Sequence, residues 1–149
     1  MNHKEKARAL FLSGCNCAQA VFAAFSDVTG IEEDKALLIS SSFGGGMGHI
    51  GETCGAVTGM FMAVGMICGY TEGDADTKKA HYNKISELAD EFKAEFEFLR
   101  CPDLMENLSG GKYALPDEEV YKNRPCLIFV EKGVELVEKI LKEGNKNGN

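Results

Sequence analysis

Residues 54–68, CGAVTGMFMAVGMIC, limit the possible folds of this chain more than any other segment. The segment is apolar on every side, as expected of a helix that other helices enclose. It is shorter than the ~20 residues that a helix needs to cross a bilayer. Gly55, Gly59 and Ala63 recur every four residues, so one face would carry only small side chains and a neighbouring helix could approach closely. We therefore expect a buried, glycine-rich central helix and no membrane insertion.

Helical spacing also dominates the rest of the chain. After a break at Gly14, Asn16 can cap a helix that Gly30 closes. Asp74 or Asp76 can begin a long amphipathic helix, which we expect to end where Pro102 forbids continuation.

The remaining segments are assigned in the same way. Residues 32–42 fit a helix, although LLISSSF could also form a strand. Residues 107–123 read as a loop with about one helical turn, and Pro125 fits the first turn of a last helix. The sequence thus predicts an all-α fold, a compact multi-helix bundle around the central helix, in a single domain over residues 1–149 with a frayed tail from about residue 143.

The charge of the chain and its N-terminal sequence limit which partners and which location are expected. The chain has 16 basic and 23 acidic residues, a formal net charge of −7, and no stretch that concentrates Lys and Arg. Nucleic acid and anionic membrane are therefore not expected partners. The N-terminus lacks the continuous apolar core of a signal peptide, so export is not indicated.

The stretch GGGMGHIGETCGAVTG contains a G-x-G-x-x-G spacing. A dinucleotide site also needs a strand before it and a second strand that ends in an acidic residue, and no second strand is predicted here. Glycines in such a run instead let the backbone turn sharply and bring N–H groups close to a ligand or a thiol. The candidate binding residues are Gly45, Gly46, Gly48, Gly51 and His49.

Six cysteines are many for a chain of this length. They are Cys15, Cys17, Cys54, Cys68, Cys101 and Cys126. Stable disulfides are rare in a reducing compartment, which leaves metal binding, redox chemistry or plain burial. Four of the six, Cys17, Cys54, Cys101 and Cys126, fall at predicted helix starts, where the helix dipole is expected to lower a thiol pKa.

The strings GCNCAQAVFAAF and FGGGMGHIGETCGAVTGMFMAVG, followed by cysteines in RCPDLM and RPC, resemble the redox-active proteins named for their C_GCAxxG_C_C pattern. The resemblance covers residues 8 to about 140. It implies a small, helical, cytoplasmic protein, often encoded near transporters, whose four family cysteines are Cys17, Cys54, Cys101 and Cys126. The chain departs from the pattern at Cys15, where an aromatic residue is more usual, and at Cys68.

Two mechanisms and a plain structural role are open. In the first, a low-pKa Cys54 attacks a disulfide or an oxidised acceptor and a second cysteine resolves the mixed intermediate, so that the protein is a thiol-dependent oxidoreductase. In the second, the same four cysteines bind zinc or an iron–sulfur cluster. In the third, the protein is a helical adaptor whose cysteines only pack.

Several further roles are expectations of the same kind. His49 could activate a thiol or bind a metal. Cys15 is expected to be an accessory or resolving thiol, and Cys68 is expected to be packed and inert. The expected partners are a redox partner or a transporter-associated protein, and the face of small residues could also serve a homo-oligomer.

Overall fold

The computed structural model describes residues 1–146, and nearly all of that part is helical or in loops between helices. The elements in chain order are α1 (His3–Leu12), α2 (Cys17–Ala23), α3 (Ser26–Thr29), α4 (Glu33–Ser40), the short 3₁₀-helix η1 (Ser41–Phe43), α5 (Gly44–Met47), α6 (Gly55–Cys68), α7 (Ala75–Phe96), α8 (Cys101–Ser109), α9 (Glu119–Asn123) and α10 (Leu127–Lys146). Residues 1–146 form no β-strand, and their one β-type pairing is an isolated antiparallel bridge between Thr53 and Arg100. The predicted all-α class is confirmed, and residues 33–43 are helical rather than extended.

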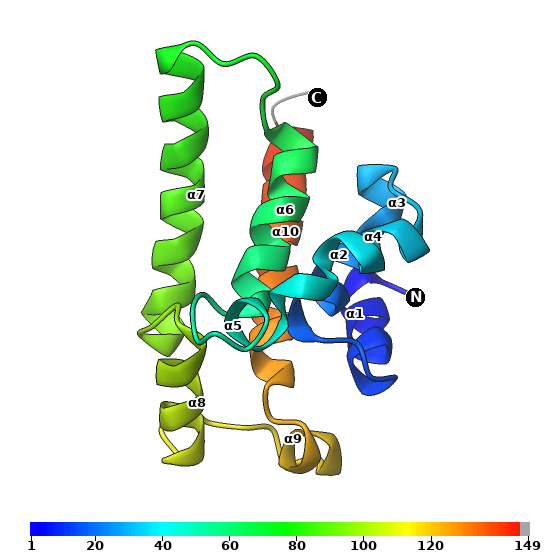
Figure 1. Cartoon of the computed structure of the whole chain (residues 1–149), viewed down its shortest axis with the longest axis vertical. Coiled ribbons are helices and arrows are strands. Elements are labelled where there is room, and N and C mark those ends of the chain that lie inside the picture. The colour runs from blue at the N-terminus through cyan, green and yellow to red at the C-terminus, as the bar shows by residue number, and fades with distance from the viewer. Residues whose placement is uncertain (147–149) are drawn as a thin grey trace.

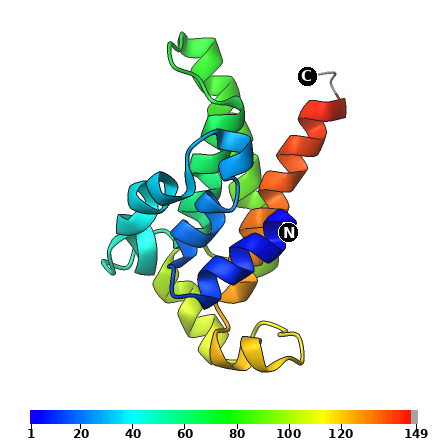
Figure 2. The ribbon, with the colours of Figure 1, turned by 90° about the vertical axis from the view of Figure 1, so that its right-hand side faces the viewer.

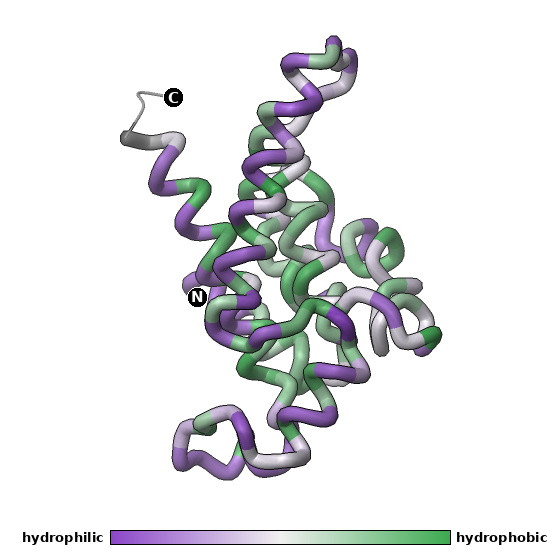
Figure 3. The backbone as a smooth tube through the Cα atoms, turned by 90° about the vertical axis from the view of Figure 1, so that its left-hand side faces the viewer, coloured by the Kyte–Doolittle hydropathy of each residue, from purple (hydrophilic) through white to green (hydrophobic). Residues whose placement is uncertain are grey.

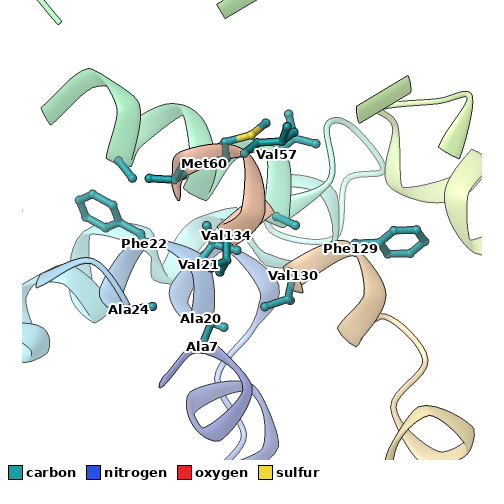
Figure 4. Close-up of a cluster of buried hydrophobic side chains, with 14 of the residues drawn as sticks. Ala7, Ala20, Val21, Phe22, Ala24, Val57, Met60, Phe129, Val130 and Val134 are labelled. Atoms are coloured by element: carbon teal, nitrogen blue, oxygen red, sulfur yellow. The ribbon is translucent and has the colours of Figure 1, made fainter. Parts of the chain in front are cut away.

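The core forms where α2, α6 and α10 meet (Figure 1). Side chains from these helices and from α1 interlock there, with Val21 of α2, Met60 of α6 and Val130 of α10 each fully buried (Figure 4). Helix α1 lies against α10 (Figure 2). The close-up shows that segments far apart in the sequence supply one continuous apolar cluster.

Glycines set the spacing between these helices. A Cβ atom added to Gly59 of α6 would lie 2.7 Å from the Ala18 carbonyl oxygen of α2. A Cβ atom added to Gly133 of α10 would lie 3.1 Å from the Ala56 carbonyl oxygen of α6. The first distance is too short for any real Cβ contact and the second is shorter than most, so glycine at these positions lets α6 lie close to its two neighbours.

Helix α6 is buried mainly between Gly55 and Val64 and is exposed at its C-terminal end, so residues 54–68 are not enclosed over their whole length as expected. Met60 and Ala63 have no exposed surface, whereas Met66 near the C-terminal end is 50% exposed and Cys68 is also exposed. The apolar composition of the segment therefore exceeds what the burial of this helix requires.

Helix α7 begins at the predicted cap, because the Asp74 side chain accepts a hydrogen bond from the Thr77 N–H at 2.8 Å. Its C-terminal half packs through Phe92 and Phe96 on Phe129 of α10. Hydrophilic residues dominate its other end (Figure 3).

Two predicted helix ends are wrong. Helix α7 ends at Phe96, and Pro102 lies in the first turn of α8, where a missing N–H has no cost. Pro125 lies before α10, which begins at Leu127 and continues to Lys146, past the predicted start of the frayed tail. Residues 147–149 of that tail lie outside the described part of the chain.

Candidate functional site

Four cysteines that are far apart in the sequence line one pocket of about 630 Å³. Cys17 is the first residue of α2, and Cys101 is the first residue of α8. Cys54 directly precedes α6, and Cys126 directly precedes α10. The predicted positions at helix starts are therefore confirmed, and the fold brings the four side chains together around a single cavity.

Asn16 fixes the start of α2 and with it the position of Cys17. The Asn16 side chain accepts from the Gln19 N–H at 2.9 Å, and the Gln19 side chain accepts from the Asn16 N–H at 3.0 Å. The Asn16 amide also donates to the Ser41 carbonyl at 3.1 Å. This reciprocal capping satisfies N–H groups at the helix start and joins it to the segment before the glycine-rich loop.

The bridge between Thr53 and Arg100 holds Cys54 and Cys101 on adjacent backbone segments. The Cys54 N–H donates to the Leu99 carbonyl at 2.8 Å, and the Cys101 N–H donates to the Glu52 carbonyl at 2.8 Å. Neither segment has the alternating pattern of a strand, so nothing in the sequence indicates this contact.

The glycine-rich loop is a left-handed turn. Residues 45–49 all have positive φ, between 58° and 74°, and two of them, Met47 and His49, are not glycine. A left-handed conformation costs a non-glycine residue roughly 1–2 kcal/mol. Such a run of strained residues is typical of a segment whose shape serves a site.

Glycines also make room for two of the thiols. A Cβ atom on Gly46 would lie 2.8 Å from the Cys101 Cβ. A Cβ atom on Gly55 would lie 3.3 Å from the Cys17 Cβ. The backbone of the loop and of α6 thus fits directly against two cysteine side chains.

The five predicted binding residues divide into two groups. Gly45, Gly48 and His49 line the pocket, whereas Gly46 and Gly51 do not. The position of Gly46 is set by its contact with Cys101. Gly51 lies beside Pro102, and its carbonyl accepts a hydrogen bond from Arg100 at 3.1 Å.

His49 lines the pocket and is exposed to solvent. A Cβ atom on Gly45 would lie 2.4 Å from the His49 Nδ1 atom, so the imidazole lies directly over that glycine.

The expected lowering of the cysteine pKa values is wrong. Burial raises the pKa of Cys54 to about 12 and the pKa of Cys17 well above its ordinary value. Burial also raises the pKa values of Cys101 and Cys126. The N–H groups of Ala56 and Val57 act in the opposite direction on Cys54, but the loss of solvent has the larger effect. At neutral pH these side chains are therefore thiols and not thiolates.

Arg124 is a pocket residue that the sequence analysis did not identify. Its Nη1 atom donates to the Phe11 carbonyl at 3.1 Å, and its guanidinium carbon lies 4.1 Å from the centroid of the Phe11 ring. Its positive charge counteracts part of the rise in the pKa values of Cys17 and Cys126. The only signal for it in the sequence is its position two residues before Cys126.

Met105 is a second pocket residue that sequence reasoning missed. Its Sδ atom lies 3.3 Å from the Cys126 Sγ atom. Met105 lies one helical turn after Cys101 on α8, so this contact links the start of α10 to the pocket face of α8.

The two other cysteines do not line the pocket. Cys15 is partly exposed and lies outside it, although Cys17 two residues later lies inside. Cys68 is exposed at the C-terminal end of α6, with its sulfur 3.4 Å from the Val64 carbonyl and 3.9 Å from the Lys84 Nζ atom. The expectation that Cys68 is packed is therefore wrong.

The six cysteines are free thiols, with no disulfide among them. Within residues 1–146 no three His, Cys, Asp or Glu side chains are grouped closely enough to hold a metal ion. The interpretation of the four pocket cysteines as ligands of zinc or an iron–sulfur cluster stays a prediction, and no distance in this arrangement favours it.

No helix in the part of the chain that the structure describes has the length and apolar character required to cross a bilayer.

A family model described as "Putative redox-active protein (C_GCAxxG_C_C)" matches residues 15–140. No curated protein and no solved structure matches the chain.

Proposed function

The chain belongs to the C_GCAxxG_C_C family, whose model spans most of its length, and we propose that it is a thiol–disulfide exchange protein that reacts in the pocket lined by its four cysteines. One observation carries this proposal, which is the convergence of Cys17, Cys54, Cys101 and Cys126 from four helices on one cavity. A fold that needed cysteines only as small core residues would not require four of them to face the same cavity.

Cys101 is the residue that attacks the incoming disulfide. Cys101 is partly exposed, whereas Cys54 is buried. An attacking thiol must reach a sulfur atom of the substrate and must release its proton, and burial opposes both steps. This assignment replaces the expectation that Cys54 attacks.

Cys54 is the resolving residue. Because Thr53 and Arg100 form an antiparallel bridge, Cys54 and Cys101 are diagonal neighbours, a relation that places Cα atoms roughly 7–8 Å apart. A disulfide needs a Cα separation of about 4.4–6.8 Å, so a shift of order 1 Å would allow the bond to form. Gly51 lies three residues before Cys54 and gives the backbone there the conformational freedom for such a shift.

The reaction is balanced in sulfur, protons and electrons. The Cys101 thiolate attacks one sulfur of a substrate disulfide, the substrate S–S bond breaks, and one substrate thiolate leaves and takes up the proton lost by Cys101. The Cys54 thiolate then attacks the Cys101 sulfur, and the second substrate thiolate leaves and takes up the proton lost by Cys54. The protein dithiol is oxidised to a disulfide while one substrate disulfide is reduced to two thiols.

The test is to oxidise the reduced protein with 2-hydroxyethyl disulfide and to map the products by peptide mass spectrometry. We expect a reversible Cys54–Cys101 disulfide and release of two equivalents of 2-mercaptoethanol. Cys54→Ser should trap the mixed disulfide on Cys101, because the second attack is lost. Cys15→Ser is the matched control, since Cys15 lies outside the pocket.

Failure to form any reversible disulfide among the four pocket cysteines would refute the proposed function. A disulfide between Cys101 and Cys126 would retain the function and reassign the resolving residue. The redox or transporter-associated partner, the homo-oligomer and the cytoplasmic location stay predictions.

A further inference from the structure

The pocket carries a positive charge, whereas the chain as a whole is negatively charged. The sequence has 23 acidic residues and a formal net charge of −7, but no Asp or Glu is among the residues that line the pocket. The lining includes one permanent cation, Arg124, and the imidazole of His49. An anion that enters this cavity would therefore meet a cation and no carboxylate.

Arg124 also differs from the other two arginines of the chain. Arg8 pairs with Glu118, and Arg100 pairs with Glu52 and Asp103. Among the described residues, Arg124 has no carboxylate within ion-pair distance, and its recorded hydrogen bond is with a backbone carbonyl. A guanidinium has five N–H donors in a planar fork that fits a carboxylate, so most of its donor capacity is available to a ligand.

The backbone adds to this positive character. Helix α8 begins at a pocket cysteine, and α6 and α10 each begin one residue after one. The N-terminal ends of three helix dipoles therefore lie at the cavity. Each such end has the effect of a partial positive charge on a nearby anion. The dipoles act together with Arg124, which supplies the full charge.

The volume of the cavity is that of a site for a small molecule and not for a protein substrate. A volume of about 630 Å³ lies within the range of about 300–1,000 Å³ that is typical of pockets for small ligands. Cys101 is one of the residues that line this cavity, so a disulfide that occupies the cavity lies next to its thiol.

Resting on the proposed function, we propose that the substrate of this pocket is a low-molecular-weight disulfide that carries carboxylate groups, and that Arg124 binds one of these carboxylates. The carboxylate–guanidinium contact places the S–S bond beside Cys101 at the cavity. Exchange then follows the two steps given above, with two small carboxylate-bearing thiols as products.

The experiment compares three disulfides as oxidants of the reduced protein. Oxidised glutathione is anionic, 2-hydroxyethyl disulfide is neutral and cystamine is cationic. The second-order rate constant for loss of pocket thiols is measured for the wild type, Arg124→Gln and Lys139→Gln, and each rate is divided by the rate of the same disulfide with a free model thiol. Lys139 is the matched control, because its loss changes the net charge equally and it pairs with Glu91 away from the pocket.

We expect the corrected rate of oxidised glutathione to exceed that of cystamine by at least about tenfold in the wild type, the size of effect typical of electrostatic steering. Arg124→Gln should remove most of this preference, so that the corrected rates with oxidised glutathione and cystamine become similar to each other. Lys139→Gln should retain the preference. An equal loss of rate with all three disulfides would show that Arg124 acts only on the fold, and would overturn the inference.

Salt provides a test in the wild type that does not depend on the folding of a variant. If Arg124 attracts the ligand, added salt will lower the rate with oxidised glutathione, because it screens the attraction. If the net charge of −7 governs encounter, added salt will raise that rate, and the inference is wrong. Reaction with the neutral disulfide but no preference for the anionic one overturns the inference alone, whereas no reaction with any of the three overturns the proposed function.

Discussion

At the scale of single residues, the buried thiol of Cys54 has a measurable thermodynamic consequence. Its pKa is about 12 in the folded chain, against an ordinary value of 9.0. Well below pH 9 the thiol is neutral in both the folded and the unfolded chain, and the stability does not depend on its titration. Between pH 9 and about 12 the unfolded chain loses the proton more readily, so the free energy of unfolding falls as the pH rises.

We expect the free energy of unfolding of the reduced protein to fall less steeply above pH 9 in Cys54→Ala than in the wild type. The difference in slope should approach about 1.4 kcal/mol per pH unit, the amount linked to one proton. Urea unfolding between pH 7 and pH 11, with a reductant present, measures it. Cys68→Ala, which removes an exposed thiol outside the pocket, is measured beside it as the comparison variant. Equal slopes in Cys54→Ala and the wild type would contradict the raised pKa.

At the scale of elements, the packing of α6 on α2 depends on one glycine. A Cβ atom on Gly59 would lie 2.7 Å from the Ala18 carbonyl oxygen and 3.1 Å from the Val21 Cβ, whereas a Cβ atom on Gly65 of the same helix meets nothing within 4 Å. We expect Gly59→Ala to destabilise the fold by roughly 1–3 kcal/mol, the usual cost of overpacking. Gly65→Ala should stabilise it by about 0.5–1 kcal/mol, because alanine favours a helix over glycine.

Thermal and urea unfolding of the two alanine variants under the same conditions provide the comparison. Both variants add the same methyl group to α6, so a difference in sign isolates the contact with α2. If Gly59→Ala were as stable as Gly65→Ala, the close approach of the two helices would be wrong.

The elements also show which parts of the structure local sequence could predict. The caps at Asn16 and Asp74 were predictable because a cap depends on residues within one turn. The four cysteines could be placed at helix starts for the same reason. The bridge between Thr53 and Arg100 and the position of Arg124 in the pocket lining depend on long-range packing, which no local pattern encodes.

The error in the cysteine pKa values has the same origin. The position of a cysteine at a helix start is visible in the sequence, but the burial that outweighs the helix dipole depends on the whole fold. The exposure of Cys68 likewise depends on which side of α6 its neighbours cover.

At the scale of the whole molecule, the proposed disulfide would link two distant parts of the chain. Cys54 precedes α6 and Cys101 begins α8, so the closed loop contains all of α6 and α7. Helix α6 packs on α2 and α10, and α7 packs on Phe129 of α10. Oxidation in the pocket would thus constrain residues 54–101 in the unfolded chain, and because α6 and α7 pack on the rest of the bundle, the redox state of the site would change the stability of the whole protein.

We expect the oxidised protein to be more stable than the reduced protein by up to about 4 kcal/mol, the loop-entropy value for a closed loop of about 50 residues. The measured value should be lower, because a diagonal pair must shift before the bond forms and the shift costs part of the gain. Urea unfolding with and without a reductant measures the difference. Cys101→Ser should show no such difference, whereas Cys15→Ser should behave as the wild type. An oxidised form less stable than the reduced one would show that the Cys54–Cys101 bond does not fit this fold, and the resolving residue would then be another thiol of the same pocket.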